Sequence, residues 1–171
     1  MALSRSDTKA QQNAARRGNL RAQAAVSAAG GTRDSVLVTA ATLLLTNTDH
    51  GGLDVLLSRA GGIAVTLPAA TGSGAIFRLI VITDFTSSAT IKVANASDTM
   101  IGALHTATTT TGAGTHEAAG GTDDTITLNG TTTGGLAGTV IEIRDVAATK
   151  WLVTGDLVGS GTLATPLSAT V

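Results

Sequence analysis

The chain of 171 residues contains no cysteine, which excludes disulfide-stapled scaffolds, thiolate zinc sites and enzymes with a cysteine nucleophile. Aromatic side chains are nearly as scarce, at 2% of the residues, with no tyrosine, one tryptophan and two phenylalanines. Because proteins that bind single-stranded nucleic acids stack bases on aromatic rings, we expect no nucleic-acid partner. Charged residues reach only 13%, about half the usual share.

Long hydrophobic runs are missing too. No stretch approaches 18 consecutive apolar residues, so we expect no transmembrane helix and no membrane partner. Charges are scattered through the first 31 residues, where the apolar segment of a secretory signal would lie. With 43% apolar residues and a net charge of −1, the chain does not have the composition of a disordered charged segment. Glutamate, lysine and leucine are too few for a coiled coil.

What the chain does have is an uneven distribution of charge. Residues 1–30 hold five basic side chains against the single acid Asp7, a balance of +4, whereas residues 31–171 hold six basic and eleven acidic side chains, a balance of −5. We therefore predict a basic N-terminal arm over 1–30 and a body over 31–171. The alanine-rich composition and a stop at Gly30-Gly31 favour a marginal helix in the arm, and an extended arm is the alternative.

From residue 35 onward the sequence changes to short runs of β-branched residues separated by glycine-rich turns. In the run Thr139–Asp145, alternation places Glu142 and Arg144 on a charged face, onto which Val140 also falls. This pattern favours an all-β fold, with an antiparallel β-sandwich or barrel-like body of short strands, and no helical pattern supports an α/β fold. The expected strands are Ser35–Thr39, Thr42–Thr46, Leu53–Ser58, Ile63–Leu67, Ala75–Thr83, Ala89–Val93, Thr99–Leu104, Thr125–Leu128, Thr139–Asp145 and Lys150–Thr154.

Residues 106–122 (TATTTTGAGTHEAAGGT) differ from the rest of the body, because they are rich in threonine and glycine and hold no large apolar side chain. We predict a long exposed loop there, or a flat hairpin. A structureless loop of this length is unusual in a compact domain unless it has a function or packs on a neighbour, such as another subunit. Throughout the body, small side chains also imply a thin core, since threonine and alanine bury little apolar area. Self-association would compensate for that core, so a homo-oligomer is expected.

The sequence offers no recognisable catalytic or metal-binding motif. His116-Glu117 lacks the second histidine of a zinc-binding HExxH segment, and residues 72–74 (GSG) lack the lysine of a phosphate-binding loop. We therefore predict no enzyme, no cofactor and no metal; a polysaccharide-degrading enzyme, the remaining catalytic alternative, would need carboxylates clustered in a groove. Five side chains could gather around a metal only if the 106–122 segment folded back on itself, and we interpret them as solvated instead. They are His105, His116, Glu117, Asp123 and Asp124.

Two local predictions concern single residues. Trp151, on the last long strand, is expected to anchor the core. The alternative is that it stacks on a sugar, but surfaces that bind sugars usually use several aromatic rings, and this chain has few. Asn129-Gly130 is expected to form a type I′ turn, since this residue pair tolerates the positive φ angles that the turn requires.

Four segments resemble β-domains found on the virions of tailed bacteriophages. They are residues 63–81 (IAVTLPAATGSGAIFRLIV), 91–102 (IKVANASDTMIG), 124–130 (DTITLNG) and 150–153 (KWLV). The resemblance covers roughly residues 36–168 and consists of strand and turn residues rather than catalytic groups. The compact size, the basic arm and the lack of a shaft repeat make the chain more similar to a capsid decoration (cement) protein than to a fibre.

This resemblance implies a non-enzymatic structural role on the outer capsid surface of the virion. Such proteins form trimers or other small oligomers on the major capsid protein, often with an N-terminal segment reaching along it, and we predict a trimer. An acidic capsid surface would attract the basic arm. The alternatives are a head-fibre or tail-fibre module for host attachment, and an arm that only keeps the chain in solution. The candidate capsid-contact residues are Arg5, Lys9, Arg16, Arg17 and Arg21.

Overall fold

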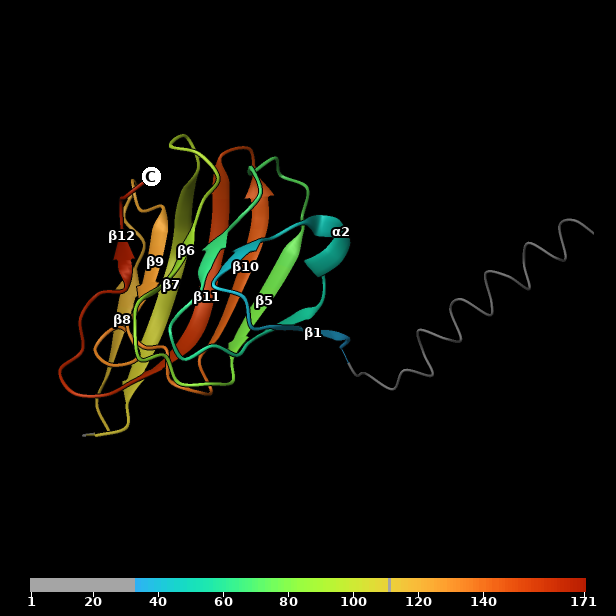
Figure 1. The fold of residues 1–171 in the computed structure, drawn as a ribbon. Coiled ribbons are helices and arrows are strands. Elements are labelled where there is room, and N and C mark those ends of the chain that lie inside the picture. The colour runs from blue at the N-terminus through green and yellow to red at the C-terminus, as the bar shows by residue number, and fades with distance from the viewer. Residues whose placement is uncertain (1–32, 111) are drawn as a thin grey trace, which may run out of the picture. The chain divides into compact units, whose positions relative to one another are not determined.

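Strands dominate the computed structural model, which describes residues 33–110 and 112–171 (Figure 1). Asp34–Val171 forms one unit built from two β-sheets, so the all-β prediction is confirmed. The predicted arm over 1–30, with its five candidate contact residues, lies outside the described residues. Among the described residues, no helix is long and apolar enough to cross a membrane.

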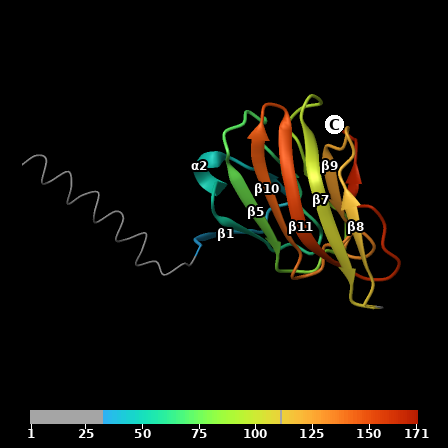
Figure 2. The ribbon, with the colours of Figure 1, turned by 180° about the vertical axis from the view of Figure 1, so that it is seen from behind.

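One sheet contains seven strands, which in spatial order are β1 (Ser35–Val38), β3 (Asp54–Leu57), β5 (Ile76–Val81), β10 (Val140–Ala147), β11 (Lys150–Gly159), β7 (Thr99–Thr108) and β8 (Gly114–Ala118). Figure 2 shows its outer face, with β11 between β10 and β7. The other sheet contains five strands, which in spatial order are β12 (Leu167–Ser168), β9 (Thr125–Leu128), β6 (Ala89–Lys92), β4 (Ala64–Thr66) and β2 (Thr42–Leu44). The two views show the sheets facing each other as layers (Figures 1 and 2).

The strand directions correct one prediction, because both sheets are mixed rather than antiparallel. Strands β1, β3 and β5 run parallel in one sheet, and β2, β4 and β6 run parallel in the other. From β1 to β6 each strand joins the sheet opposite to that of the strand before it, so neighbours within a sheet are separated by a full circuit of the chain and point the same way. Alternating hydrophobicity shows that a segment is a strand but not which sheet it joins.

Between β2 and β3 the chain forms a four-residue helix, α2 (Asn47–His50). Thr46 caps it, since its Oγ1 accepts a hydrogen bond from the backbone N–H of Asp49 at 3.1 Å. Four residues are too few to produce a helical period, which is why the sequence pattern shows only a turn there.

Within residues 106–122, for which the sequence allows a loop or a flat hairpin, the end of β7 and the whole of β8 pair with one another as a hairpin. Strand β7 continues to Thr108 and pairs antiparallel with β8, with His105 opposite His116. The sequence of β8, GTHEA, has no alternating apolar residues, so it is absent from the expected strands. Its pairing makes the hairpin a continuation of the seven-stranded sheet.

The core lies between the two sheets and includes Trp151, which is fully buried. The Trp151 ring packs against Phe77 with 5.9 Å between the ring centroids. On β5, Phe77, Leu79 and Val81 point inward at alternate positions, and other strands contribute valine, leucine and isoleucine in the same way. The prediction that Trp151 anchors the core is confirmed.

The loop at Asn129-Gly130 is not the expected type I′ turn, which requires positive φ at both central residues. Gly130 has a φ of 74°, but Asn129 does not have a positive φ. Instead, Asn129 Oδ1 accepts hydrogen bonds from the backbone N–H groups of Thr131 and Thr133 at 2.9 and 3.1 Å. The asparagine side chain therefore organises a longer loop.

Thr149, in the turn between β10 and β11, is the single non-glycine residue of the described range with a positive φ, 63°. We expect Thr149→Gly to raise the free energy of unfolding by about 0.5–1 kcal/mol, because glycine adopts this conformation without the steric cost that a β-branched residue incurs. Urea unfolding measures the change. Ala148→Gly, at the neighbouring position without a positive φ, is the control and should be destabilising; equal effects of the two substitutions would contradict the prediction.

Candidate functional site

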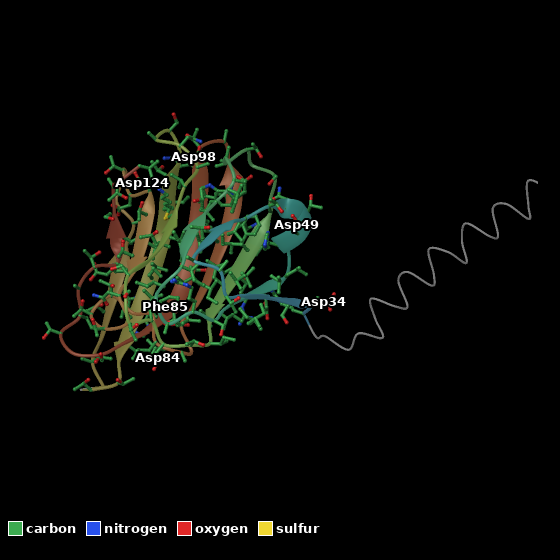
Figure 3. All side chains as sticks on the ribbon, viewed as in Figure 1. Asp34, Asp49, Asp84, Phe85, Asp98 and Asp124 are labelled. Atoms are coloured by element: carbon green, nitrogen blue, oxygen red, sulfur yellow. The ribbon has the colours of Figure 1, made fainter. Side chains whose placement is uncertain are left out.

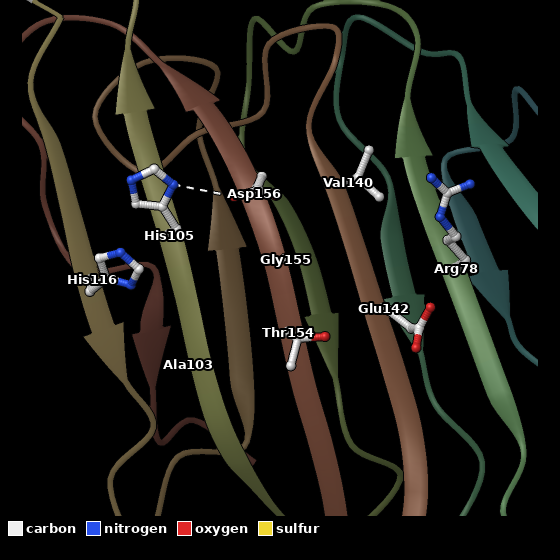
Figure 4. Close-up of a pocket in the computed structure, with 9 residues that line it drawn as sticks. All are labelled: Arg78, Ala103, His105, His116, Val140, Glu142, Thr154, Gly155 and Asp156. Carbon is white, nitrogen blue, oxygen red and sulfur yellow. Dashed lines mark hydrogen bonds and ion pairs between the residues drawn. The ribbon is translucent and has the colours of Figure 1, made fainter.

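The outer face of the seven-stranded sheet carries a hollow of about 500 Å³ (Figure 4). It extends over β5, β10, β11, β7 and β8, and its lining combines charged side chains with small residues such as Ala103 and Gly155. Where the lining residues are small, the surface of the sheet is lower than at the longer side chains beside them. The residues that line it are Arg78, Ala103, His105, His116, Val140, Glu142, Thr154, Gly155 and Asp156.

One row of this hollow crosses the sheet through directly paired residues. Arg78 on β5 lies opposite Glu142 on β10, and Glu142 lies opposite Thr154 on β11, which pairs in turn with Ala103 on β7. Arg78 also forms an ion pair with Asp54 on β3, with 2.9 Å between Nη1 and Oδ2. Both side chains of this pair are partly shielded from water, so the bond holds the guanidinium at one wall of the hollow.

A second row lies two residues further along the strands. Val140 pairs with Asp156, Asp156 pairs with His105, and His105 pairs with His116. The two imidazole rings stack with 4.5 Å between their centroids, and His105 Nδ1 lies within hydrogen-bond distance of Asp156 Oδ1, at 3.2 Å. The Asp156 side chain is 84% exposed, so this row offers its polar atoms to a partner in solution.

The stacked histidines raise the question of a metal ion. Within the described ranges, no group of three or more histidine, cysteine, aspartate or glutamate side chains is arranged to hold one. Of the ligand set considered in the sequence, His105 and His116 come into contact. Glu117 pairs with a buried residue on the opposite face of the sheet, and Asp123 and Asp124 accept hydrogen bonds from backbone N–H groups. The groups that the hollow does present are hydrogen-bonding and charged side chains, among them Arg78, Glu142 and Asp156.

Three further aspartates, Asp98, Asp124 and Asp145, are buried, and each holds a loop (Figure 3 labels the first two). Both carboxylate oxygens of Asp145 accept hydrogen bonds from residues 71–73. Burial by itself would raise the pKa of Asp145, but these hydrogen bonds, foremost those from Ser73, outweigh it and lower the pKa to about 2. These carboxylates are structural and none lines the hollow.

A second hollow, of about 460 Å³, lies beside the β7–β8 hairpin. Its lining residues are uncharged, so it offers neither an acid nor a base. The hydroxyl of Thr115 is buried without a hydrogen-bond partner among the described residues. The lining residues are Thr108, Ala113, Thr115, Gly161, Thr162 and Leu163.

The sequence could identify part of the main hollow. Alternation in the run that becomes β10 predicted Glu142 on a charged face shared with Val140, and both residues line the hollow. Arg78 was missed because it is one charged residue in an otherwise apolar strand, and Asp156 was missed because it follows Thr154, where the last long strand was expected to end. Only the pairing of five strands brings them to the same surface.

Comparison with known proteins finds no matching family model, no matching curated protein and no matching solved structure. The function is therefore argued from the residues themselves. Two features of the body bear on it: charged groups of both signs around an open hollow, and buried carboxylates that are engaged in holding loops.

Proposed function

We propose that the chain is a non-enzymatic structural protein of a tailed bacteriophage, which binds the outer surface of the capsid and reinforces it. The observation that carries this proposal is the separation of charge, +4 over residues 1–30 and −5 over 31–171. An acidic body is repelled by an acidic capsid surface, whereas the basic arm is attracted to it. The partner is the major capsid protein, and the arm supplies the contact residues.

Self-association fits this role, with a trimer as the expected form. Each copy would contribute one arm, and several weak arm contacts act together because binding of the first raises the local concentration of the others. The body would then serve as the scaffold that joins the arms. Its loops suit that task, since Asp98, Asp124 and Asp145 tie them to the strands through hydrogen bonds.

For the fold we infer a β-sandwich rather than a barrel. The support is the strand order, in which the two sheets are separate and each has two edge strands, whereas a closed barrel has none. The buried hydrophobic residues form one cluster to which strands of both sheets contribute. Strand β1, the first strand of the body, is an edge strand of the seven-stranded sheet.

The arm proposal predicts the effect of removing its charge. Replacing the five basic residues of the arm with glutamine is expected to weaken binding to capsids that lack the protein by at least tenfold, and to reduce the dependence of binding on salt. Co-sedimentation with capsids at low and moderate ionic strength measures both effects. The substituted residues are Arg5, Lys9, Arg16, Arg17 and Arg21.

The matched control keeps the charge and replaces the four arginines of the arm with lysine. This variant should retain most of the binding, because attraction to an acidic surface needs the charge rather than the guanidinium shape. Full occupancy of the capsid by the glutamine variant would show that the arm is not the contact.

The second candidate is a head-fibre or tail-fibre module that attaches to the host. It is favoured by the main hollow, because His105 and His116 join Arg78, Glu142 and Asp156 in a set of side chains that could bind the hydroxyls of a surface glycan. Binding of the labelled protein to host cells, weakened by Glu142→Gln and unaffected by removal of the arm charge, would support this role over decoration.

A further inference from the structure

We propose that the outer face of the seven-stranded sheet is the surface through which one copy of the chain binds a second copy. This inference rests on the self-association proposed above and adds its location. It is independent of what the arm contacts. Two properties of the face carry it: a continuous apolar row and a balance of positive and negative charge.

The apolar row crosses four adjacent strands through directly paired residues. Leu37 on β1 pairs with Leu56 on β3, Leu56 pairs with Ile80 on β5, and Ile80 pairs with Val140 on β10. All four side chains point away from the core, and Leu37 is 60% exposed. A row of four adjacent aliphatic side chains on an outer face marks a surface that another protein covers.

Most of the large hydrophobic residues that are exposed in the described part of the body lie on or beside this sheet. Of the six large hydrophobic residues that are exposed in the described part of the chain, three lie on strands of this sheet and one directly follows β5. The other two are Leu44 on β2 and Val171. The four on or beside the seven-stranded sheet are Leu37, Ile82, Ile101 and Val146.

Charge on this face is balanced, unlike charge on the rest of the body. Alternation along β10 and β11 places the basic residues Arg144 and Lys150 on the same side of the sheet as Arg78. Three acidic side chains lie on this side too: two line the main hollow and one forms the ion pair with Arg78. The face thus holds three of the six basic residues of the body but only three of its eleven acids. The acids are Asp54, Glu142 and Asp156.

The balanced charge of this face indicates which partner binds it. A partner of uniform charge would meet as many like charges as opposite ones on this face. A second copy presents the same mixture, so charges of opposite sign on the two copies can meet across the contact. Two bodies that each carry −5 repel one another over most of their surface, so they approach with least repulsion through the face that carries no net charge.

The shape of the face agrees with this occupant. Stable interfaces have an apolar centre with a polar rim, and here the apolar row lies beside the main hollow and shares Val140 with it. The hollow leaves room for side chains of the second copy, and Glu142, Asp156 and His105, which line it, can form hydrogen bonds with them. The row would form the centre of the contact and the hollow its rim.

The test compares two leucines that are matched in exposure and position. Leu37 is 60% exposed on β1, an edge strand of the seven-stranded sheet, and Leu44 is 64% exposed on β2, an edge strand of the five-stranded sheet. The mass in solution is measured by light scattering over a series of concentrations. We expect wild type to exceed the 16.9 kDa of one chain, Leu37→Ser to raise the dissociation constant at least tenfold, and Leu44→Ser to leave it unchanged.

Both variants replace an exposed side chain, so circular dichroism should show that both remain folded. If Leu44→Ser dissociates the oligomer as much as Leu37→Ser, or neither variant does, the assigned face is wrong while self-association stands. A wild type that stays at the mass of one chain overturns the self-association itself. Capsid co-sedimentation of Leu37→Ser, measured separately, reports on the arm contact, so the two proposals can fail independently.

Discussion

Gly130→Ala is expected to prevent stable folding of the body, with a loss of more than about 4 kcal/mol in the free energy of unfolding. Gly130 has a φ of 74°, and a Cβ at this position would overlap the backbone carbonyl oxygen of Phe85, which Figure 3 labels. The Phe85 backbone cannot move away easily, because Phe85 N–H donates a hydrogen bond to Gly135 O at 3.0 Å and the Phe85 side chain is buried in the core.

The control for this substitution is Gly52→Ala. Gly52 has nearly the same φ, 76°, but a Cβ there would meet no atom within 4 Å. It should therefore show only the cost of placing alanine in the left-handed region, about 1 kcal/mol. Urea unfolding of both variants separates the cost of backbone conformation from that of the clash. A difference of less than 1 kcal/mol between them would contradict the close approach of Phe85 to Gly130.

Asp145→Asn is expected to lower the free energy of unfolding by about 2–4 kcal/mol. The Asp145 carboxylate accepts five hydrogen bonds from Thr71, Gly72 and Ser73, three of them from backbone N–H groups. An asparagine has one acceptor oxygen in place of two, and its amide N–H₂ would face some of these N–H and O–H donors. Those donors would then be buried without a hydrogen-bond acceptor. Asp156→Asn is the control, because the Asp156 side chain is 84% exposed, and it should change stability by less than about 0.5 kcal/mol.

The same residue makes stability depend on pH. The pKa of Asp145 is about 2 in the folded chain and 3.8 for the unperturbed group, so its ionised form contributes stability above pH 3.8 that is lost as the pH falls toward 2. Urea unfolding from pH 5 to pH 2 should show this decline in wild type and a shallower decline in Asp145→Asn. Some slope should remain, because hydrogen bonds from Thr170, Thr125 and Val171 outweigh burial and also lower the pKa of Asp124. Parallel pH profiles for the two proteins would contradict this role of Asp145.

Strand positions could be predicted from the sequence wherever β-branched residues alternate between turns, as in β5 and β10. Strand ends and short strands were missed where that alternation is absent. Strand β11 was expected to end at Thr154, yet it continues to Gly159, because Gly155 breaks the apolar pattern without breaking the pairing with β7. Strand β12 has only two residues and carries no periodic signal.

Strand direction and the site depend on information that a local pattern does not contain. Parallel pairing of β1 with β3 follows from the passage of the chain through the opposite sheet between them, and that passage is a property of the assembled core. The hollow likewise needs the register of five strands to bring Arg78 beside Glu142 and His105 beside Asp156. A slip of one residue in any pair would turn such a side chain into the core.

The place of β11 in the sheet affects how the chain is made. This strand joins β10 to β7, so without it the seven-stranded sheet would fall into two pieces, β1-β3-β5-β10 and β7-β8. It also supplies Trp151 to the core, yet it is the last strand but one of the body, followed only by the two-residue β12. On the ribosome, the body therefore cannot close its core until nearly all of it has been synthesised. Its folding is expected to be late, cooperative and slow, as for other proteins with pairing between distant strands.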